Sequence, residues 1–342
     1  MKKKARNLLK IGAIYLGTVL GAGFASGQEL LLFFVRFGNR GLVGCLLAGG
    51  LFCLLGALIL KRSYALPDKS CKQYLQMVFP DRVSTFLHSA MEVFLCISFC
   101  IMLSGAGAFF KERFSLSPLL GVFVMDLICL LVFLYDLKGL SLLNVLLTPV
   151  MLLGTVYVCV YTIFTDTTSV WLPQVHPHGR FLPFALFYVG YNMLTATAVL
   201  VPSSALADSE KTAVRGGILG GVCLTVMALL SCLALHFQHN VWQTSLPMLL
   251  LSQRAGRWTY GVYSAVLYMA MLTTAVSTGF SVVKSIEKTG IGKKTSALLV
   301  CMVALPLSFV EFSTLVRYCY VFFGVLGMVL VGGILWDWYK RI

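Results

Sequence analysis

Long apolar runs follow one another along this chain and are separated by short polar segments. Each run has about the 20 residues that an α-helix needs to cross roughly 30 Å of hydrocarbon. We predict ten membrane spans, at 10–36, 41–61, 85–110, 117–135, 140–165, 181–204, 214–236, 258–286, 295–311 and 316–337. The pattern predicts an all-α integral membrane protein, and we expect no attached soluble domain.

The composition agrees with a lipid environment. Of the 342 residues, 58% are hydrophobic and 12% are charged, whereas a soluble domain has about 25% charged residues. The formal net charge of +14 would suggest a nucleic-acid partner in a soluble protein, but here the Lys and Arg residues stand between apolar runs. We therefore interpret them as topology signals and expect membrane lipid, not nucleic acid, around the chain.

The basic residues also orient the chain. With the N-terminus in the cytoplasm, nineteen Lys and Arg fall in inner segments and eight in outer segments. Because cytoplasmic segments are enriched in these residues, we predict that both termini are cytoplasmic. Segment 62–84 is then an inner connection and 166–180 an outer one. Residues 245–253 in the outer connection 237–257 are apolar but too short to cross, which predicts a surface or re-entrant helix or a plain amphipathic one.

Cysteine and catalytic patterns add little. Ten of the eleven cysteines lie inside apolar runs, and no CxxC pair occurs, so we interpret them as small buried hydrophobic residues. The sequence has no convincing metal-ligand spacing, serine-base pair, phosphate loop or dinucleotide fingerprint. We predict that the protein is not an enzyme and has no cofactor.

The first predicted span contains a glycine-rich stretch, GTVLGAGFASGQE, from Gly17 to Glu29. Each glycine weakens a helix by up to about 1 kcal/mol relative to alanine. In a bilayer, broken backbone is tolerated where it faces protein or a water-filled cavity, and transporters place substrates at such midplane breaks. We predict an unwound segment around Gly23; close helix packing through GxxxG is the alternative. Free N–H groups there suit a carboxylate, and free C=O groups suit a small cation.

Glu29 follows this stretch inside the same span. Burying a carboxyl group in a membrane is costly and usually functional. At 1.5 Å per residue, Glu29 would lie about 9 Å outward from Gly23 if the helix ran on. We consider three roles for it: an outer gate, a partner for a substrate amine, or a protonatable coupling group. Glu92 and Asp126 also lie in spans, where structural pairing and a proton relay are equally open.

The sixth and eighth predicted spans carry further polar positions. Span 6 has Tyr188, Gly190, Tyr191 and Asn192 in mid-membrane, and because spans 1 and 6 each open a set of five, we predict a second interruption there. Span 8 has hydroxyl residues on one helical face at Thr274, Ser277 and Thr278, beside Thr273. They are candidate sodium ligands; ordinary bonding of hydroxyls to their own helix is the alternative.

The stretch from Gly17 to Glu29 resembles span 1 of bacterial YkvI-type amino-acid permeases in the amino acid-polyamine-organocation (APC) superfamily. The resemblance extends to the length and the ten-span layout. It implies a LeuT-like fold with a 5+5 inverted repeat, with spans 1 and 6 discontinuous around a central substrate, in a bacterial cytoplasmic membrane. The two repeats would be 1–168 and 169–342, forming a single transport domain.

The resemblance also implies site residues. Gly21, Ala22 and Gly23 match the segment whose amides hold a substrate carboxylate. The carbonyls of Gly17 and Leu20 match sodium ligands, with Thr273 and Thr274 or, alternatively, Ser277 and Thr278. Some proton-coupled relatives have a lysine in span 5; its absence here favours sodium. Phe24 stands where some sodium-coupled relatives have Asn, which gives no support to a second sodium site.

These observations favour a secondary active transporter that couples a cation, preferably sodium, to a small zwitterionic solute such as an amino acid. Gly21, Ala22 and Gly23 would hold the carboxylate. Phe24, Tyr188, Gly190 and Tyr191 would shape the pocket, and Asn192 would add a hydrogen bond. The alternatives are a proton-coupled permease and a non-transporting membrane receptor for an amino acid. The sequence does not specify the oligomeric state.

Overall fold

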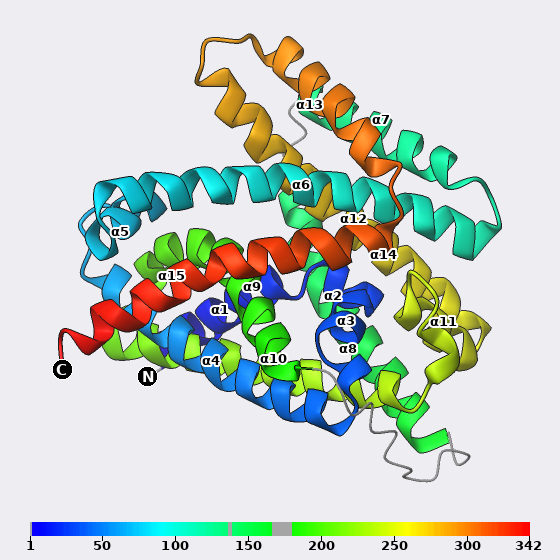
Figure 1. The fold of residues 1–342 in the computed structure, drawn as a ribbon, viewed down its shortest axis with the longest axis horizontal. Helices are drawn as coiled ribbons and strands as arrows, with labels where there is room; N and C mark the ends of the chain where they lie inside the picture. The colour runs from blue at the N-terminus through cyan, green and yellow to red at the C-terminus, as the bar shows by residue number, and fades with distance from the viewer. Residues whose placement is uncertain (1, 136–138, 166–179) are drawn as a thin grey trace.

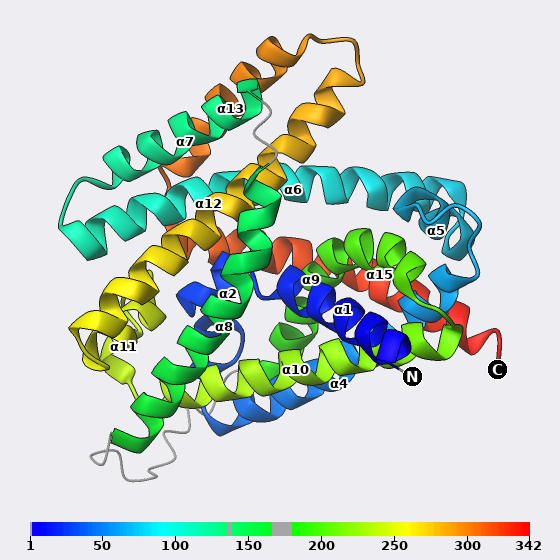
Figure 2. The same cartoon turned by 180° about the vertical axis from the view of Figure 1, so that it is seen from behind.

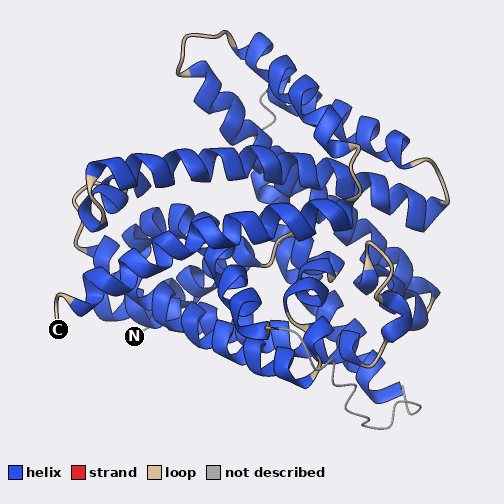
Figure 3. Cartoon of the chain, viewed as in Figure 1, coloured by secondary structure: helices blue, strands red, loops and turns tan. Residues whose placement is uncertain are grey.

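A computed structural model describes residues 2–135, 139–165 and 180–342, and these ranges contain helices and loops but no strands (Figure 3). The α-helices are α1 (Lys2–Val19), α2 (Ala22–Ser26), α3 (Gln28–Phe33), α4 (Asn39–Tyr64), α5 (Cys71–Val78), α6 (Asp81–Phe114), α7 (Pro118–Tyr135), α8 (Gly139–Thr165), α9 (Phe181–Ser203), α10 (Glu210–His236), α11 (Pro247–Arg254), α12 (Arg257–Glu287), α13 (Lys293–Ser308), α14 (Phe312–Leu315) and α15 (Val321–Tyr339). Between α14 and α15 lies η4, a π-helical turn at Val316–Tyr320. The predicted all-α class is confirmed.

Helices occupy all ten predicted spans. Among the described residues, seven helical segments are long and apolar enough to cross a membrane: 39–64, 81–114, 118–135, 181–206, 210–236, 257–287 and 312–339. The first predicted span is divided into α1, α2 and α3, the described apolar part of the fifth is Pro149–Thr165, and the ninth has 16 residues. The chain is a multi-pass membrane protein, and the count of ten stays a prediction. The predicted outer loop up to residue 179 and the repeat boundary at 168/169 lie outside the described residues.

The long helices form two groups. In the first, α1, α4, α9 and α10 pack on one another, and we call it the bundle. In the second, α6, α7, α12 and α13 do the same, and we call it the scaffold; Figure 1 shows the bundle below it. The short helix α2 contacts α12 of the scaffold, while α8 contacts both α10 and α12. The interrupted first span therefore lies where the two groups meet.

Glycines allow the bundle helices to approach closely. A Cβ on Gly217 of α10 would lie 2.6 Å from the carbonyl carbon of Gly56 in α4, and one on Gly221 would lie 2.6 Å from the nitrogen of Cys53. On the same helix, a Cβ on Gly220 would lie 2.7 Å from the Tyr15 ring of α1. In lipid, such small residues let backbones pack at short range, which is a main source of helix association.

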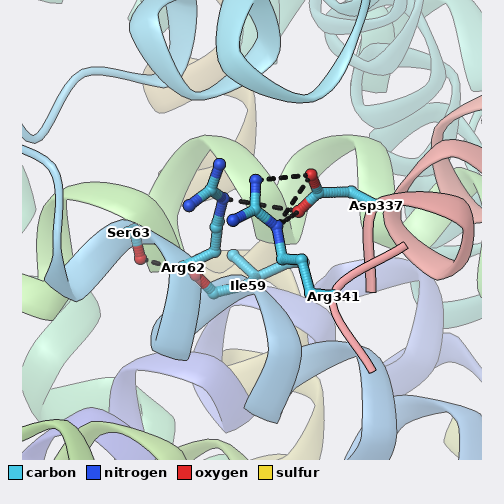
Figure 4. A network of polar contacts seen from close by, with 5 residues as sticks. All are labelled: Ile59, Arg62, Ser63, Asp337 and Arg341. Atoms are coloured by element: carbon cyan, nitrogen blue, oxygen red, sulfur yellow. Dashed lines mark hydrogen bonds and ion pairs between the residues drawn. The ribbon is translucent and has the colours of Figure 1, made fainter. Parts of the chain in front are cut away.

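The two ends of the chain lie at the same end of the molecule (Figures 1 and 2). There Asp337 of α15 forms ion pairs with two arginines: Arg62 Nε of α4 lies 3.3 Å from Oδ2, and Arg341 Nη2 lies 3.1 Å from Oδ1 (Figure 4). Beside this network, the Ser63 hydroxyl donates to the carbonyl oxygen of Ile59 at 2.7 Å. The ion pair between Arg62 and Asp337 joins the end of α4 to the end of α15.

Candidate functional site

The first helix stops at the position where glycines are densest. Helix α1 ends at Val19, and the amide of Gly21 donates to the carbonyl oxygen of Val19 at 2.9 Å. Gly21 itself is extended (φ −82°, ψ −171°), and α2 begins at Ala22. Among the described residues, no backbone amide outside α1 donates to the carbonyls of Gly17 or Leu20. The interruption therefore presents carbonyl oxygens at the end of α1 and amides at the start of α2.

A second turn follows at Gly27. Its φ of +82° is left-handed, which glycine adopts without strain, and a Cβ there would lie 2.7 Å from Met248 Cγ of α11. Helix α11 thus packs on the turn, and it also contacts α2, α8 and α12. The helix predicted within 245–253 is confirmed at Pro247–Arg254.

The side chain of Glu29 returns toward Gly23. The carboxylate oxygen Oε1 lies where a Cβ on Gly23 would be, so the two could not coexist. Glu29 is 5% exposed. The carboxyl group therefore does not lie about 9 Å from Gly23 as predicted for a continuous helix, because the left-handed turn at Gly27 separates α2 from α3. The carboxyl group sits at the glycine segment, not outward of it.

An aromatic cluster surrounds this carboxyl group. The Tyr191 hydroxyl of α9 donates to Glu29 Oε2 at 2.5 Å. The Tyr191 ring stacks on Tyr320 with centroids 4.6 Å apart and on Phe33 at 5.6 Å, while Tyr188 meets it edge-on at 5.6 Å. Carboxyl group and rings come from α3, α9 and η4. A hydrogen bond therefore joins spans 1 and 6, and ring stacking joins span 6 to span 10. Tyr320 was not predicted as a site residue.

Phe24 and Tyr188 share a second feature of the site. Both line a small apolar cavity of about 10 Å³, together with Val19, Phe52 and Leu224. That volume is about the minimum for one water molecule. The structure thus brings together two of the predicted pocket residues, around a cavity too small for a solute larger than water.

The predicted interruption of span 6 is wrong: α9 runs as one helix from Phe181 to Ser203. Gly190 serves packing instead, because a Cβ on it would overlap the carbonyl oxygen of Gly324 in α15, and one on Gly327 would overlap Gly190. The Asn192 amide donates to the Tyr188 carbonyl of its own helix at 2.9 Å. Gly190 and Asn192 therefore act within α9 and at its contact with α15.

We expect Gly190→Ala to destabilise the protein, because the new methyl group would push α9 and α15 apart. Overpacking of this kind costs about 1–3 kcal/mol. Thermal unfolding in detergent measures it as a lower midpoint. Gly332→Ala on α15, where a Cβ meets nothing within 4 Å, is the control; equal midpoints for the two variants would contradict the packing role.

The span 8 hydroxyls bond to their own helix in this structure. Thr273 and Thr274 both donate to the Ala270 carbonyl, at 3.2 and 2.8 Å, and Thr278 donates to Thr274 at 2.8 Å. Thr273 is buried, Thr274 is half-buried and Ser277 is exposed. Their role as sodium ligands stays a prediction.

The contact of α12 with the interrupted span is made by Tyr263, which sequence reasoning missed. Its hydroxyl donates to the carbonyl oxygen of Ala25 at 2.7 Å and lies 3.5 Å from Thr155 Oγ1 of α8. No sequence pattern distinguishes this tyrosine from the others. It ties α2 to α12.

Two other membrane carboxyl groups lie elsewhere. Glu92 of α6 accepts from the Ser285 hydroxyl at 2.8 Å, which is the structural pairing considered for it. Asp126 of α7 is buried and lies near Cys301 of α13. Both partners of these contacts belong to the scaffold helices.

Known proteins resemble this chain in sequence and in fold. No family model matches the chain. It is 28% identical over 338 residues to "Uncharacterized membrane protein YkvI" of Bacillus subtilis (strain 168), covering 98% of this chain and 97% of that protein. It is 21% identical over 324 residues to the uncharacterized protein YyaD of the same organism, covering 93% of each.

Solved structures match over nearly the whole chain. Mhp1 in an inward-facing conformation aligns with a TM-score of 0.65 and 15% identity, covering 97% of this chain and 76% of Mhp1. The fold is shared with Mhp1. A manganese transporter of Eremococcus coleocola aligns with a TM-score of 0.65 and 14% identity, over 96% and 78%. The predicted LeuT-like architecture is thus supported at the level of the fold.

Proposed function

We propose that this chain is a secondary active transporter of a small zwitterionic solute, with amino acids as the expected class. The observation that carries the proposal is the interruption between Val19 and Ala22, with the buried carboxyl of Glu29 beside it. Transporters place substrates at broken helices near the bilayer midplane. The shared fold with Mhp1 and a manganese transporter supports the same class.

The helix groups suggest how the site would open. The bundle carries α1 and α9, and the scaffold carries α12, so movement of one group against the other would change access to the interruption between them. Two hydrogen bonds lie at or beside this boundary. One joins Tyr263 of α12 to Ala25 of α2, and the other joins Tyr191 of α9 to Glu29 of α3. Alternating access would break and remake such contacts.

The proposed solute would bind across the interruption. The amides of Gly21, Ala22 and Gly23 would meet its carboxylate, because the first amides of a helix carry partial positive charge. Glu29 would meet its amine, and Phe24, Tyr188 and Tyr191 would enclose its apolar part. An amine and a carboxylate on one small molecule match this pairing of opposite charges.

We further propose sodium as the coupling ion. The carbonyls of Gly17 and Leu20 would supply two oxygen ligands, and Thr273 with Thr274 would supply two more, with Ser277 and Thr278 as the alternative pair. Hard cations take oxygen ligands of this kind. Movement of the scaffold helix α12 against α1 would change the distance between the two sets.

Uptake of amino acids into proteoliposomes is expected to depend on an inward sodium gradient and to fall about tenfold or more in Thr274→Ala. Losing one ligand oxygen weakens ion binding, and each 1.4 kcal/mol changes an equilibrium tenfold. Thr165→Ala on α8 is a matched control, because that hydroxyl also bonds to its own helix, donating to the Tyr161 carbonyl oxygen at 2.7 Å.

Several outcomes would contradict this proposal. Equal uptake with and without sodium would remove the sodium coupling. Saturable binding of an amino acid with no flux across the liposome membrane would instead indicate a receptor.

Proton coupling is the second candidate, and Glu29 favours it. A buried carboxyl group in a membrane span, hydrogen-bonded to a tyrosine, can carry a proton between the two sides as access alternates. In that case a pH gradient would drive uptake without sodium.

A further inference from the structure

A groove of about 430 Å³ lies between α8 and α12, away from the interrupted span. The two helices cross on the face shown in Figure 2. Leu153 and Tyr157 form the α8 rim, and Trp258 and Val262 form the α12 rim. Gly154 and Tyr263 lie between the rims. None of the residues from Gly17 to Glu29 lines it.

The rims of the groove face outward. Leu153 is 71% exposed and Trp258 is 86% exposed, and Tyr157 and Val262 are about half exposed. On a spanning helix of a multi-pass membrane protein, exposed apolar side chains meet acyl chains, not water. Trp258 stands at the first turn of α12 next to Arg257, and tryptophan is enriched where headgroups begin. The groove therefore opens to the lipid, with one end close to the headgroup level.

Glycine keeps the floor of the groove open. A Cβ on Gly154 would lie 3.7 Å from the Tyr263 ring, with no other atom within 4 Å. A Cβ there would make ordinary van der Waals contact with the ring, and the further atoms of a larger side chain would take up part of the groove. A hollow of this size is within the range of ligand sites, about 300–1,000 Å³.

The floor is connected to the interrupted span. The Tyr263 ring lines the groove, while its hydroxyl points away from it and donates to the Ala25 carbonyl of α2. A displacement of this ring would move the hydroxyl that is bonded to the backbone of α2. The groove and the interruption thus share one side chain.

We propose that the groove binds one acyl chain of a membrane phospholipid, and that the bound chain holds Tyr263 in place and thereby steadies α2. An acyl chain is the occupant that the surroundings supply, and most of the lining is apolar. The polar groups of the lining are the Trp258 indole N–H and the hydroxyls of Tyr157, Thr259 and Tyr263, and the last two donate to the carbonyls of Ala255 and Ala25. A lipid tail in this position would regulate the mobility of the interrupted span without entering the substrate site.

Photolabelling of the full chain in phosphatidylglycerol liposomes tests the site. A phospholipid with a diazirine in the middle of one acyl chain should give adducts concentrated on peptides 150–157 and 258–266. Gly154→Leu should reduce these adducts several-fold. Gly50→Leu on α4, where a Cβ also meets nothing within 4 Å, should leave them unchanged.

Amide hydrogen exchange tests the link to α2. Adding the same phospholipid to delipidated protein should slow exchange in residues 21–27 of the wild type, and Gly154→Leu should not respond. Labelling spread evenly over all exposed helices, or unchanged by Gly154→Leu, would overturn the site. Crosslinks between two protein copies through the groove would overturn it in favour of a subunit contact, and unchanged exchange would overturn the link. These readouts need no transport, so they stay independent of the proposed function.

Discussion

Gly23→Ala is expected to abolish uptake, because its methyl group would occupy the position of Glu29 Oε1. The carboxyl group would have to leave the glycine segment and break the hydrogen bond from Tyr191. Overpacking costs about 1–3 kcal/mol, and a buried carboxyl group left without its partner costs at least about as much again. Uptake into proteoliposomes and the thermal midpoint in detergent measure the two effects.

Gly21→Ala is the matched control, two residues away in the same stretch. A Cβ on Gly21 meets nothing within 4 Å, and its backbone lies in the extended region that alanine also adopts. We expect this variant to keep its thermal midpoint, while its uptake tests separately whether a methyl group at Gly21 obstructs the proposed carboxylate site. Equal losses in the two variants would show that the stretch responds to any added methyl group.

A double variant separates the steric overlap at Gly23 from the role of the Glu29 carboxyl group in transport. In Gly23→Ala combined with Glu29→Ala, the overlapping atoms are gone, so the thermal midpoint should recover relative to Gly23→Ala alone. Uptake should stay lost if Glu29 takes part in transport. Because the two residues touch, their effects should be non-additive; additive midpoints would mean that the contact does not exist.

Glu29→Gln is expected to lower uptake about 10- to 100-fold, although the side chain keeps its shape. The glutamine oxygen can still accept from Tyr191, so the helices should pack as before. What is lost is a negative charge and a site for a proton. A hydrogen bond to a charged group is worth about 1.5–3 kcal/mol, which corresponds to that range of affinity.

Counterflow distinguishes the two roles of this carboxyl group. Exchange of labelled for unlabelled solute needs no ion gradient, so a variant that has lost only proton coupling should still exchange. A variant that has lost its amine partner should not. Glu92→Gln, whose carboxylate accepts from Ser285, is the control and should retain gradient-driven uptake. Unchanged uptake in Glu29→Gln would remove Glu29 from the mechanism.

The break in the first span is the part of the site that sequence chemistry predicts best. Glycine weakens a helix wherever it stands, so four glycines in the stretch from Gly17 to Gly27 mark a weak segment without knowledge of the fold. The direction of the chain after Gly27 could not be predicted in this way. This direction depends on α11, which packs over the turn at Gly27. Because the direction could not be predicted, the contact of the Glu29 carboxyl group with Gly23 was not predicted either.

The same residue type misled the prediction for span 6. Gly190 has the same intrinsic weakness as Gly23, but Gly324 and Gly327 lie directly opposite on α15. Close contact between helices stabilises α9 through Gly190, so the helix stays whole. A glycine can break a helix or allow two helices to pack closely. The partner helix decides between the two, and the sequence of a single segment does not reveal that partner.

The π-helical turn at Val316–Tyr320 bears on how this site could arise. A π turn contains one residue more than an α turn and is common at functional sites, and here it ends on the tyrosine that stacks against Tyr191. A single codon inserted in an ordinary helix would create such a turn while leaving α14 and α15 in register with their neighbours. Among descendants of one ancestral gene, the loss or gain of that codon would remove or restore the Tyr320 contact in one step.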